Sequence, residues 1–438
     1  MTNAFSATRL SLFVLFCGIG LAALIGSSAR PDLLQVSAVA FISGLLTLKP
    51  NSGLYLALAF EFFYLVFVLI GVEPNVVGIG VFGYLVLEAS VKTLKPSSIG
   101  DRPQAALLWL PLLLLWGVAI GLARFQSFDV LNALRIFVFP LVAYSLIRDL
   151  TRRQLTFLLN FIGFALLLNA GAAIWETVVG PEALMQLGLT YGTEIREIGS
   201  VLRAPGLMRG NAYLGLTASF FFLGLVLFRS HLDLSRRLQN LFLVACSVAM
   251  LLSTARTGLV VLAGGVLLQR LNLKSTARNL LLTIAMVVSF SVFGAGSGDS
   301  GIARLTVWSR ALATVDFTGG GFGSMGSTTY SDFSGTKGAF SDNYYISLVQ
   351  QFGILGFAIC VAAIVYAVRL RRAPGPSGQL WAPVFGAFLL SCLVIDAWEY
   401  WPAMAVMLSW FRLTQIIENE VASADFDAAP FISSTRRR

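Results

Sequence analysis

Charged residues are scarce in this sequence. Asp, Glu, Lys and Arg make up only 12% of the 438 residues, whereas 57% are hydrophobic and the mean hydropathy is +0.79. A soluble domain typically carries about 25% charged residues, so this composition excludes an ordinary soluble protein. Apolar runs of about 20 residues, the length that crosses the hydrocarbon core of a bilayer, recur along the chain. The sequence therefore predicts a polytopic integral membrane protein.

Metal-binding and redox side chains are few. The single histidine, His231, lies in a short basic loop, and we interpret it as a solvated residue. The cysteines lie inside apolar runs without the spacing of metal ligands, and we interpret them as packing residues: Cys17, Cys246, Cys360 and Cys392. No acidic cluster has the spacing of a cation site. We therefore expect neither a metal ion nor another cofactor.

The order of apolar and polar segments predicts an all-α fold with about 12–14 transmembrane helices. Two long polar loops, which we expect to carry short interfacial helices, divide the chain. The predicted segments are transmembrane helices over 1–175, a first periplasmic loop over 176–210, central helices over 211–294, a large periplasmic loop over 295–342, C-terminal helices over 343–416 and a disordered cytoplasmic tail over 417–438.

Lysine and arginine fall mainly in alternate loops, and this bias predicts the orientation of the chain. With the N-terminus inside, most of the 31 basic residues lie on the cytoplasmic side, and both long loops lie outside. The same bias explains the net charge of +9 without a nucleic-acid partner. We expect a multi-pass membrane protein with both termini in the cytoplasm.

Arginines on the outer side depart from this bias. Five of them lie in or beside the two long loops and the turn before residue 258: Arg203, Arg209, Arg256, Arg304 and Arg310. Guanidinium groups bind phosphate through paired hydrogen bonds, so arginines gathered at the membrane surface suit a lipid-linked diphosphate. Pairing with lipid headgroups or with nearby acidic residues is the alternative. Arg256 favours function, because it lies in a tight turn between two apolar runs.

Within the second loop, residues 301–314 have apolar side chains at near-helical spacing, Trp308 among them. This pattern predicts a short amphipathic helix in the membrane interface, with an irregular loop as the alternative. The glycine cluster at 319–323 permits tight turns and close backbone approach. It is not a nucleotide-binding fingerprint, because no strand precedes it.

Asp342 stands where the second loop enters the next apolar run, followed by Asn343, Tyr344 and Tyr345. A carboxylate at this place is either the N-cap of the helix or a general base at the membrane surface.

Three further charged residues, Glu61, Glu88 and Arg135, lie within apolar runs, where charge is usually paired or functional. Arg135 with Glu61 or Glu88 is a plausible internal ion pair, and a proton relay is the competing interpretation.

The order of these motifs resembles the O-antigen ligase and Wzy-type polysaccharide polymerase family of bacterial glycan assembly, over roughly residues 200–370. The matching segments are Arg203 with Gly206 and Gly210-Asn211, the turn 253–258 with Arg256, the series Arg304, Trp308, Ala311-Leu312 and 321–323, and the helix start 342–345 followed by 353–356. Ligases of this family carry a histidine where this chain has Asp342. That departure favours a polymerase or a divergent branch.

The resemblance implies a GT-C-like glycosyltransferase of a bacterial inner membrane that moves a glycan from an undecaprenyl diphosphate donor to a hydroxyl of another lipid-linked repeat. Arginines would stabilise the diphosphate leaving group and Asp342 would assist the acceptor hydroxyl. The expected loop and acceptor residues are Trp308, Asn343, Tyr344 and Tyr345. We expect a metal-independent, inverting polymerase, with a ligase as one alternative and a membrane transporter as another. Expected partners are the lipid-linked oligosaccharide, membrane lipids, a flippase and a chain-length regulator.

Overall fold

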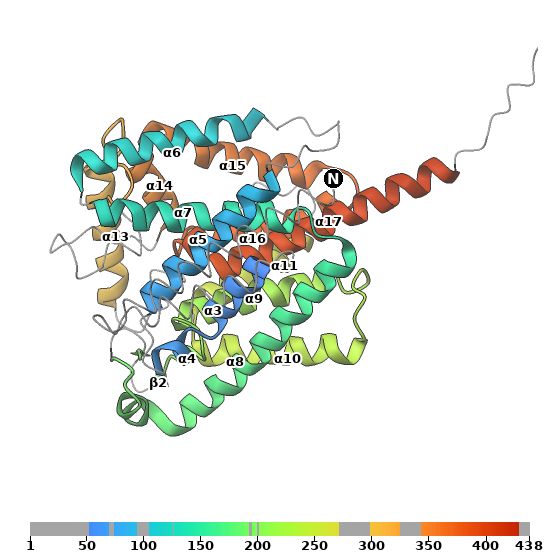
Figure 1. Ribbon diagram of the computed structural model, residues 1–438, viewed down its shortest axis with the longest axis horizontal. Coiled ribbons are helices and arrows are strands. Elements are labelled where there is room, and N and C mark those ends of the chain that lie inside the picture. Colours follow the sequence, from blue (N-terminus) through green and yellow to red (C-terminus); the bar gives the residue numbers. More distant parts are fainter. Residues whose placement is uncertain are drawn as a thin grey trace, which may run out of the picture.

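A computed structural model of the protein describes residues 52–69, 74–93, 105–125, 127–191, 195–198, 201–270, 298–324 and 343–428. This part of the chain is an all-α bundle with one small hairpin of two-residue strands, which confirms the all-α part of the prediction (Figure 1). The predicted apolar runs over 10–26, 32–48 and 280–293 lie outside the described residues.

The elements before the hairpin are α3 (Ser52–Phe62), α4 (Tyr64–Leu69), α5 (Pro74–Thr93), α6 (Ala105–Arg124), α7 (Ser127–Ile147) and α8 (Arg152–Gln186). The hairpin consists of β1 (Glu197–Ile198) and β2 (Val201–Leu202), and α9 (Asn211–Leu227), α10 (Arg236–Ser253) and α11 (Arg256–Arg270) follow it. The remaining elements are α13 (Gly298–Ala313), α14 (Tyr344–Phe352), α15 (Ile354–Arg372), the π-helix η2 (Ser377–Trp381), α16 (Ala382–Ser391), the 3-10 helix η3 (Ala397–Glu399) and α17 (Trp401–Ala428).

Helix α9 lies at the centre of the bundle and packs against α8, α10, α11 and α17. Trp410 of α17 stacks on Phe228 and donates its indole hydrogen bond to the carbonyl of Phe220. Gly224 makes this contact possible, because a Cβ atom there would lie 2.0 Å from the Trp410 ring. The core is therefore built from close helix packing around a buried tryptophan.

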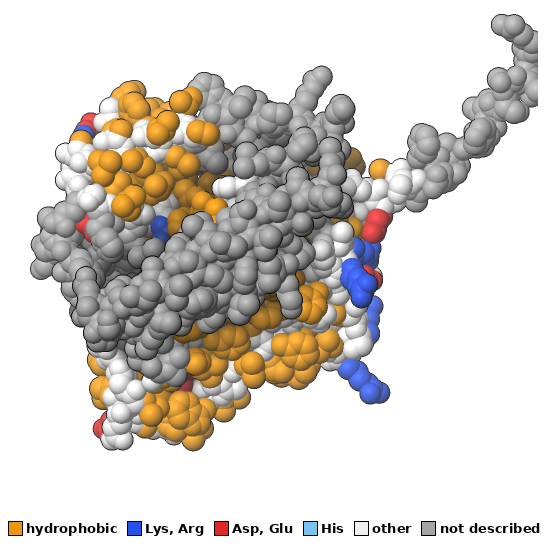
Figure 2. All heavy atoms as spheres, viewed as in Figure 1, with side chains coloured by type: hydrophobic (Ala, Val, Ile, Leu, Met, Phe, Trp, Pro, Cys, Tyr) orange, Lys and Arg blue, Asp and Glu red, His pale blue; other side chains and the backbone are white. Residues whose placement is uncertain are grey.

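Three described helices are long and apolar enough to cross a membrane, at 129–147, 152–186 and 354–372. Shorter apolar helices occupy 52–62, 80–90, 111–124, 211–227 and 257–269. Large apolar side chains also lie on the outer surface, among them Leu115, Phe157, Val178 and Leu251, and orange patches cover much of the described surface in Figure 2. Exposed apolar surface of this extent is typical of proteins that contact lipid or a partner.

The basic loops predicted to lie inside meet at one end of the bundle. Arg152 at the start of α8 binds Asp233 of the α9–α10 loop and Glu420 of α17. Arg371, near the end of α15, donates to the carbonyls of Gly378 and Gln269. The last residues of α15 and α11 therefore lie beside each other. In Figure 2 most of the visible Lys and Arg side chains gather at this end, beside the C-terminal half of α17.

Several predicted boundaries are wrong. The first polar loop was expected from residue 176, but α8 continues to Gln186 through a kink at Gly180, where φ is +80°. Proline is tolerated at the first position of a helix, so Pro181 restarts the helix after the kink. The tail expected to be disordered from 417 is helical to Ala428. The apolar runs over 52–71 and 345–368 each break into two helices, at Phe63 and Gly353.

Candidate functional site

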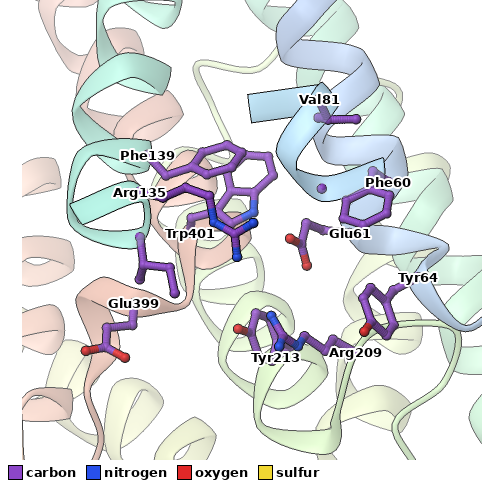
Figure 3. A pocket seen from close by; sticks show the side chains of 12 residues that line it. Phe60, Glu61, Tyr64, Val81, Arg135, Phe139, Arg209, Tyr213, Glu399 and Trp401 are labelled. Carbon is purple, nitrogen blue, oxygen red and sulfur yellow. The ribbon is translucent and has the colours of Figure 1, made fainter. Parts of the chain in front are cut away.

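A cavity opens between α3, α5, α7, α9 and the η3–α17 junction, with about 540 Å³ of space that includes some open solvent. Its polar walls come from segments far apart in the chain (Figure 3). The lining residues are Phe60, Glu61, Tyr64, Gly78, Val81, Arg135, Ile136, Phe139, Arg209, Tyr213, Glu399 and Trp401. Ligand pockets of proteins have this character, with mainly apolar walls and a few convergent polar groups.

The Glu61 carboxylate points into this cavity, as Figure 3 shows, although the residue is only 8% exposed. It lies beside the indole of Trp401 and interacts electrostatically with the guanidinium groups of Arg135 and Arg209. Its Oε2 atom is buried and has no hydrogen-bond partner among the described residues. A buried charged acceptor without a partner is energetically unfavourable, so such an atom is a candidate ligand contact.

Arg209 enters the cavity from the loop between β2 and α9. Its guanidinium lies 5.6 Å from the ring centroid of Tyr64 and beside the hydroxyl of Tyr213. The residue as a whole is exposed, so the same side chain lines the cavity and reaches solvent. Aromatic faces orient a guanidinium while leaving most of its N–H donors available to a ligand.

Buried polar groups hold the loop that carries Arg203 and Arg209. Glu176 of α8 accepts a hydrogen bond from the backbone N–H of Gly206 at 2.9 Å. Asn169 accepts from the N–H of Leu207 at 2.9 Å and donates to the carbonyl of Phe62 at 3.1 Å. The loop is thus attached to α8 and to the end of α3, next to Glu61. Gly206 is required here, because its φ of +63° favours glycine.

Arg203 lies where this loop meets the turn between α10 and α11. The N–H of the neighbouring Ala204 donates to the carbonyl of Leu252, and Asn211 donates to the carbonyl of Ser253. Arg256 is the first residue of α11, directly after this turn. The structure therefore brings the backbones of Arg203 and Arg256 to the same junction, although the side chain of Arg256 lies outside the described part.

A second cavity adjoins the first and shares Glu399 and Ile136 with it. Tyr344 and Gln351 of α14 line this second cavity. The N-cap of α14 is Asn343, whose side chain accepts from the N–H groups of Tyr345 and Ile346. Of the two alternatives for Asp342, the N-cap is therefore excluded, and Asp342 itself lies outside the described residues.

Two of the residues expected on the acceptor side, Tyr345 and Trp308, make contacts within the fold. The Tyr345 hydroxyl donates to the carbonyl of Leu389 at 2.8 Å. Trp308 is half-buried and packs on Ala311 and Ile346. The expected amphipathic helix around Trp308 is present as α13, which runs across the direction of most other helices in Figure 1. Trp308 thus attaches α13 to α14.

The two arginines of α13 are not placed at the cavity. Arg310 is exposed and does not line it. Arg304 lies in the same helix, but its side chain is outside the described part.

The glycine cluster at 319–323 is a turn whose backbone packs against α6 and α14. The N–H groups of Gly320 and Gly321 donate to the carbonyls of Gln350 and Gln351, and that of Phe322 donates to Gly117. Phe322 is fully buried against α6 and α14. Three of the backbone donors that could hold a phosphate are therefore already used within the fold.

Nearby, Arg124 and Asp316 form an exposed ion pair at 3.0 Å. The hydrogen bond from Arg124 holds the pKa of Asp316 below its ordinary value.

The sequence singled out most of the charged residues of the cavity, but it did not predict that they lie close together in space. Glu61 and Arg135 were expected to form an ion pair, and they do share the cavity, whereas Glu88 binds the N–H of Gly53 at 2.7 Å. Glu399, Glu176 and Asn169 were missed. Glu399 lies in a turn rich in aromatic residues, and the other two lie in an apolar run, where a polar residue is itself a signal.

Within the described ranges, no group of three or more His, Cys, Asp or Glu side chains could hold a metal ion. Comparison with known proteins finds no match among family models, curated proteins or solved structures. The resemblance to O-antigen ligases and Wzy-type polymerases therefore rests on the motifs of the sequence.

Proposed function

We propose that this protein is an integral membrane glycosyltransferase that transfers a glycan from undecaprenyl diphosphate to a hydroxyl of another lipid-linked repeat. The observation that carries the proposal is the cavity at which Arg135 and Arg209 meet Glu61 among apolar helices. A lipid-linked sugar diphosphate combines an apolar tail, an anionic linker and hydroxyl groups, and each has a chemical counterpart there.

In the proposed reaction, an acceptor oxygen forms a bond to C1 of the donor sugar while the bond from C1 to the diphosphate oxygen breaks. The diphosphate leaves with the bonding electron pair, and the acceptor proton passes to the Asp342 carboxylate. Arg209, with Arg203 and Arg256 at the neighbouring junction, stabilises the charge that develops on the leaving group. Direct displacement inverts the anomeric centre.

The junction of Arg203 and Arg256 supports this assignment of roles. The loop that carries Arg203 and Arg209 is bonded to α8, α3 and the turn before α11, so its backbone is held in place. Preorganised cations stabilise developing charge without reorganisation during the reaction. Arg304 and Arg310 of α13 remain candidates for the distal part of the diphosphate or for lipid headgroups.

Deleting the gene and identifying the lipid-linked species that accumulates tests the proposal. A single repeat unit indicates a polymerase, whereas a finished polymer indicates a ligase. Loss of uptake of a solute, with no accumulated lipid-linked glycan, would contradict both and favour a transporter.

A reconstituted assay makes the test direct. The accumulated species is purified and added to the protein in lipid nanodiscs, and products are resolved by mass spectrometry. We expect longer lipid-linked glycans and released undecaprenyl diphosphate in equal amounts, and we expect EDTA to leave the rate unchanged. A metal-dependent rate would contradict the metal-free mechanism, and absence of any elongated or transferred product would contradict the glycosyltransferase itself.

A further inference from the structure

We propose that the cavity around Glu61 is the subsite for the sugar directly attached to the donor diphosphate, with Glu61 Oε2 accepting a hydrogen bond from a ring hydroxyl. The inference rests on the proposed function and adds a substrate contact to it. Its starting point is a carboxylate that is 8% exposed, points into the cavity and has an oxygen without a partner among the described residues.

The charges around Glu61 decide what kind of group binds it. Arg135 and Arg209 both interact electrostatically with the carboxylate, so a cationic ligand beside it would be repelled by two guanidinium groups. An anion in contact with Oε2 would be repelled by the carboxylate itself. A neutral O–H donor satisfies the buried acceptor without either repulsion, and sugars supply such donors.

The aromatic walls suit the rest of a sugar ring. Trp401 stacks on Phe139 with ring centroids 4.3 Å apart, and both line the cavity together with Phe60. A pyranose has an apolar face of C–H groups as well as hydroxyls at its edge. A site with rigid aromatic walls and few polar groups matches both features.

Arg209 fixes the position of this subsite relative to the diphosphate. Its side chain lines the cavity beside Glu61, and the residue is exposed. A diphosphate bound by Arg209 would lie next to the cavity, which leaves the cavity for the sugar that it carries. This adjacency assigns the cavity to the first sugar of the donor.

Binding to the protein in nanodiscs tests the subsite with four probes: undecaprenyl diphosphate, and the same lipid carrying glucose, galactose or N-acetylglucosamine. We expect at least one sugar-bearing probe to bind roughly 10-fold or more tightly than the sugar-free lipid, the range of a hydrogen bond to a charged group. Equal affinity for all four would overturn the sugar subsite. No binding of any probe would overturn the proposed function as well, so the two failures are distinguishable.

Substitutions at Glu61 then locate the source of this preference. Glu61→Ala should abolish the added affinity for the sugar, while binding of the sugar-free lipid is retained or strengthened, because Arg135 and Arg209 lose a neutralising carboxylate. Glu61→Gln keeps an oxygen acceptor and should retain part of the preference. Glu88→Gln is the matched control, because Glu88 also lies in an apolar helix but binds the N–H of Gly53. A full preference in Glu61→Ala contradicts the inference.

Gly78 provides an independent steric test. A Cβ atom there would lie 3.5 Å from the Phe60 ring and 3.7 Å from Arg135 Nη1, which is ordinary van der Waals contact. Gly78→Ala should therefore bind all probes as the wild type does. Gly78→Leu should fill the cavity and abolish the sugar preference while the sugar-free lipid still binds. A wild-type preference in Gly78→Leu would show that the sugar binds elsewhere.

Discussion

At one end of the bundle, Arg152 uses all three guanidinium nitrogens within the fold, for Asp233, Glu420 and the carbonyl of His231. At the other end, Arg135 and Arg209 line a cavity, and neither makes a direct ion pair with a described residue. The first arrangement connects two loops and a helix. The second leaves guanidinium donors facing an open space.

The carboxylates differ in the same way. Asp233 and Glu420 are about half exposed and pair with Arg152, so water and a neighbouring cation both solvate them. Glu61 is buried in a cavity and keeps one oxygen without a partner among the described residues. Exposed pairs contribute little to stability, whereas buried incompletely paired groups are usually retained for function. The contrast therefore supports the proposal that ligands bind at the end that contains Glu61.

The largest effect expected from this contrast is at Arg209. Arg209→Ala should lower turnover of the lipid-linked substrate about 10³-fold, in the range found for removal of one group that stabilises developing charge. Arg209→Lys should recover little of it, because an ammonium lacks the planar fork of donors. The measurement is the initial rate of glycan transfer in nanodiscs.

Arg152→Ala is the matched control from the opposite end. It should lower the thermal unfolding midpoint, because three contacts are lost, yet keep the turnover per folded molecule. If Arg152→Ala loses turnover as strongly as Arg209→Ala, the functional difference between the two ends does not exist.

Asp342→Asn should lower turnover about 10²-fold, a typical contribution of a general base, with little change in binding of undecaprenyl diphosphate. A loss of helix capping cannot explain such an effect, because Asn343 caps α14. The comparison with Asn343→Ala separates the two roles: that variant should lower stability by about 1 kcal/mol, typical of a lost N-cap. An unchanged rate in Asp342→Asn would remove the base from the mechanism.

The helices could be predicted from the sequence, because apolar periodicity is a local signal. The segment 301–314 was expected to be helical and forms most of α13. Which of residues 342 and 343 caps α14 could not be predicted, since aspartate and asparagine are almost equally good caps and stand side by side. The end of α8 was placed before residue 176, where the apolar run stops, whereas the helix continues through the kink at Gly180 to Gln186.

The cavity could not be predicted in the same way. Glu61, Arg135 and Arg209 are separated by more than 70 residues along the chain, and only the packing of α3, α7 and α9 brings them together. The sequence marked each as unusual, because a charge in an apolar run or an arginine outside departs from the surrounding pattern. Which partner each one meets depends on tertiary contacts such as those of Asn169 with Phe62 and Leu207.

Glu176 should influence stability more than chemistry. Glu176→Ala removes the acceptor for the Gly206 N–H and should destabilise the fold by about 1–3 kcal/mol, the usual penalty for a buried donor left without its partner. Glu176→Gln keeps an acceptor and should recover most of the loss. Thermal unfolding in detergent measures both, with the exposed Glu182→Ala on the same helix as control. Equal unfolding midpoints for Glu176→Ala and Glu182→Ala would show that the Arg209 loop does not depend on this contact.

The smallest effect is expected at the exposed pair of Arg124 and Asp316. Like the pairs of Arg152, it is a solvent-exposed ion pair, but it joins the end of α6 to the loop after α13. Because Arg124 lowers the pKa of Asp316, the pair stabilises the fold above the carboxyl's unfolded pKa of about 3.9. This stabilisation is lost as pH falls through the lower folded pKa. Asp316→Asn should therefore lower the unfolding midpoint only slightly at pH 7, and the difference from the wild type should shrink as pH falls below the carboxyl's unfolded pKa. Screening by solvent keeps the effect small, and added salt should reduce it further. Unfolding midpoints of both proteins between pH 3 and 8 measure it. A large loss of stability or turnover at pH 7 would show that an exposed ion pair also contributes to the site. The proposed difference between arginines that form ion pairs and arginines that bind a ligand would then be wrong.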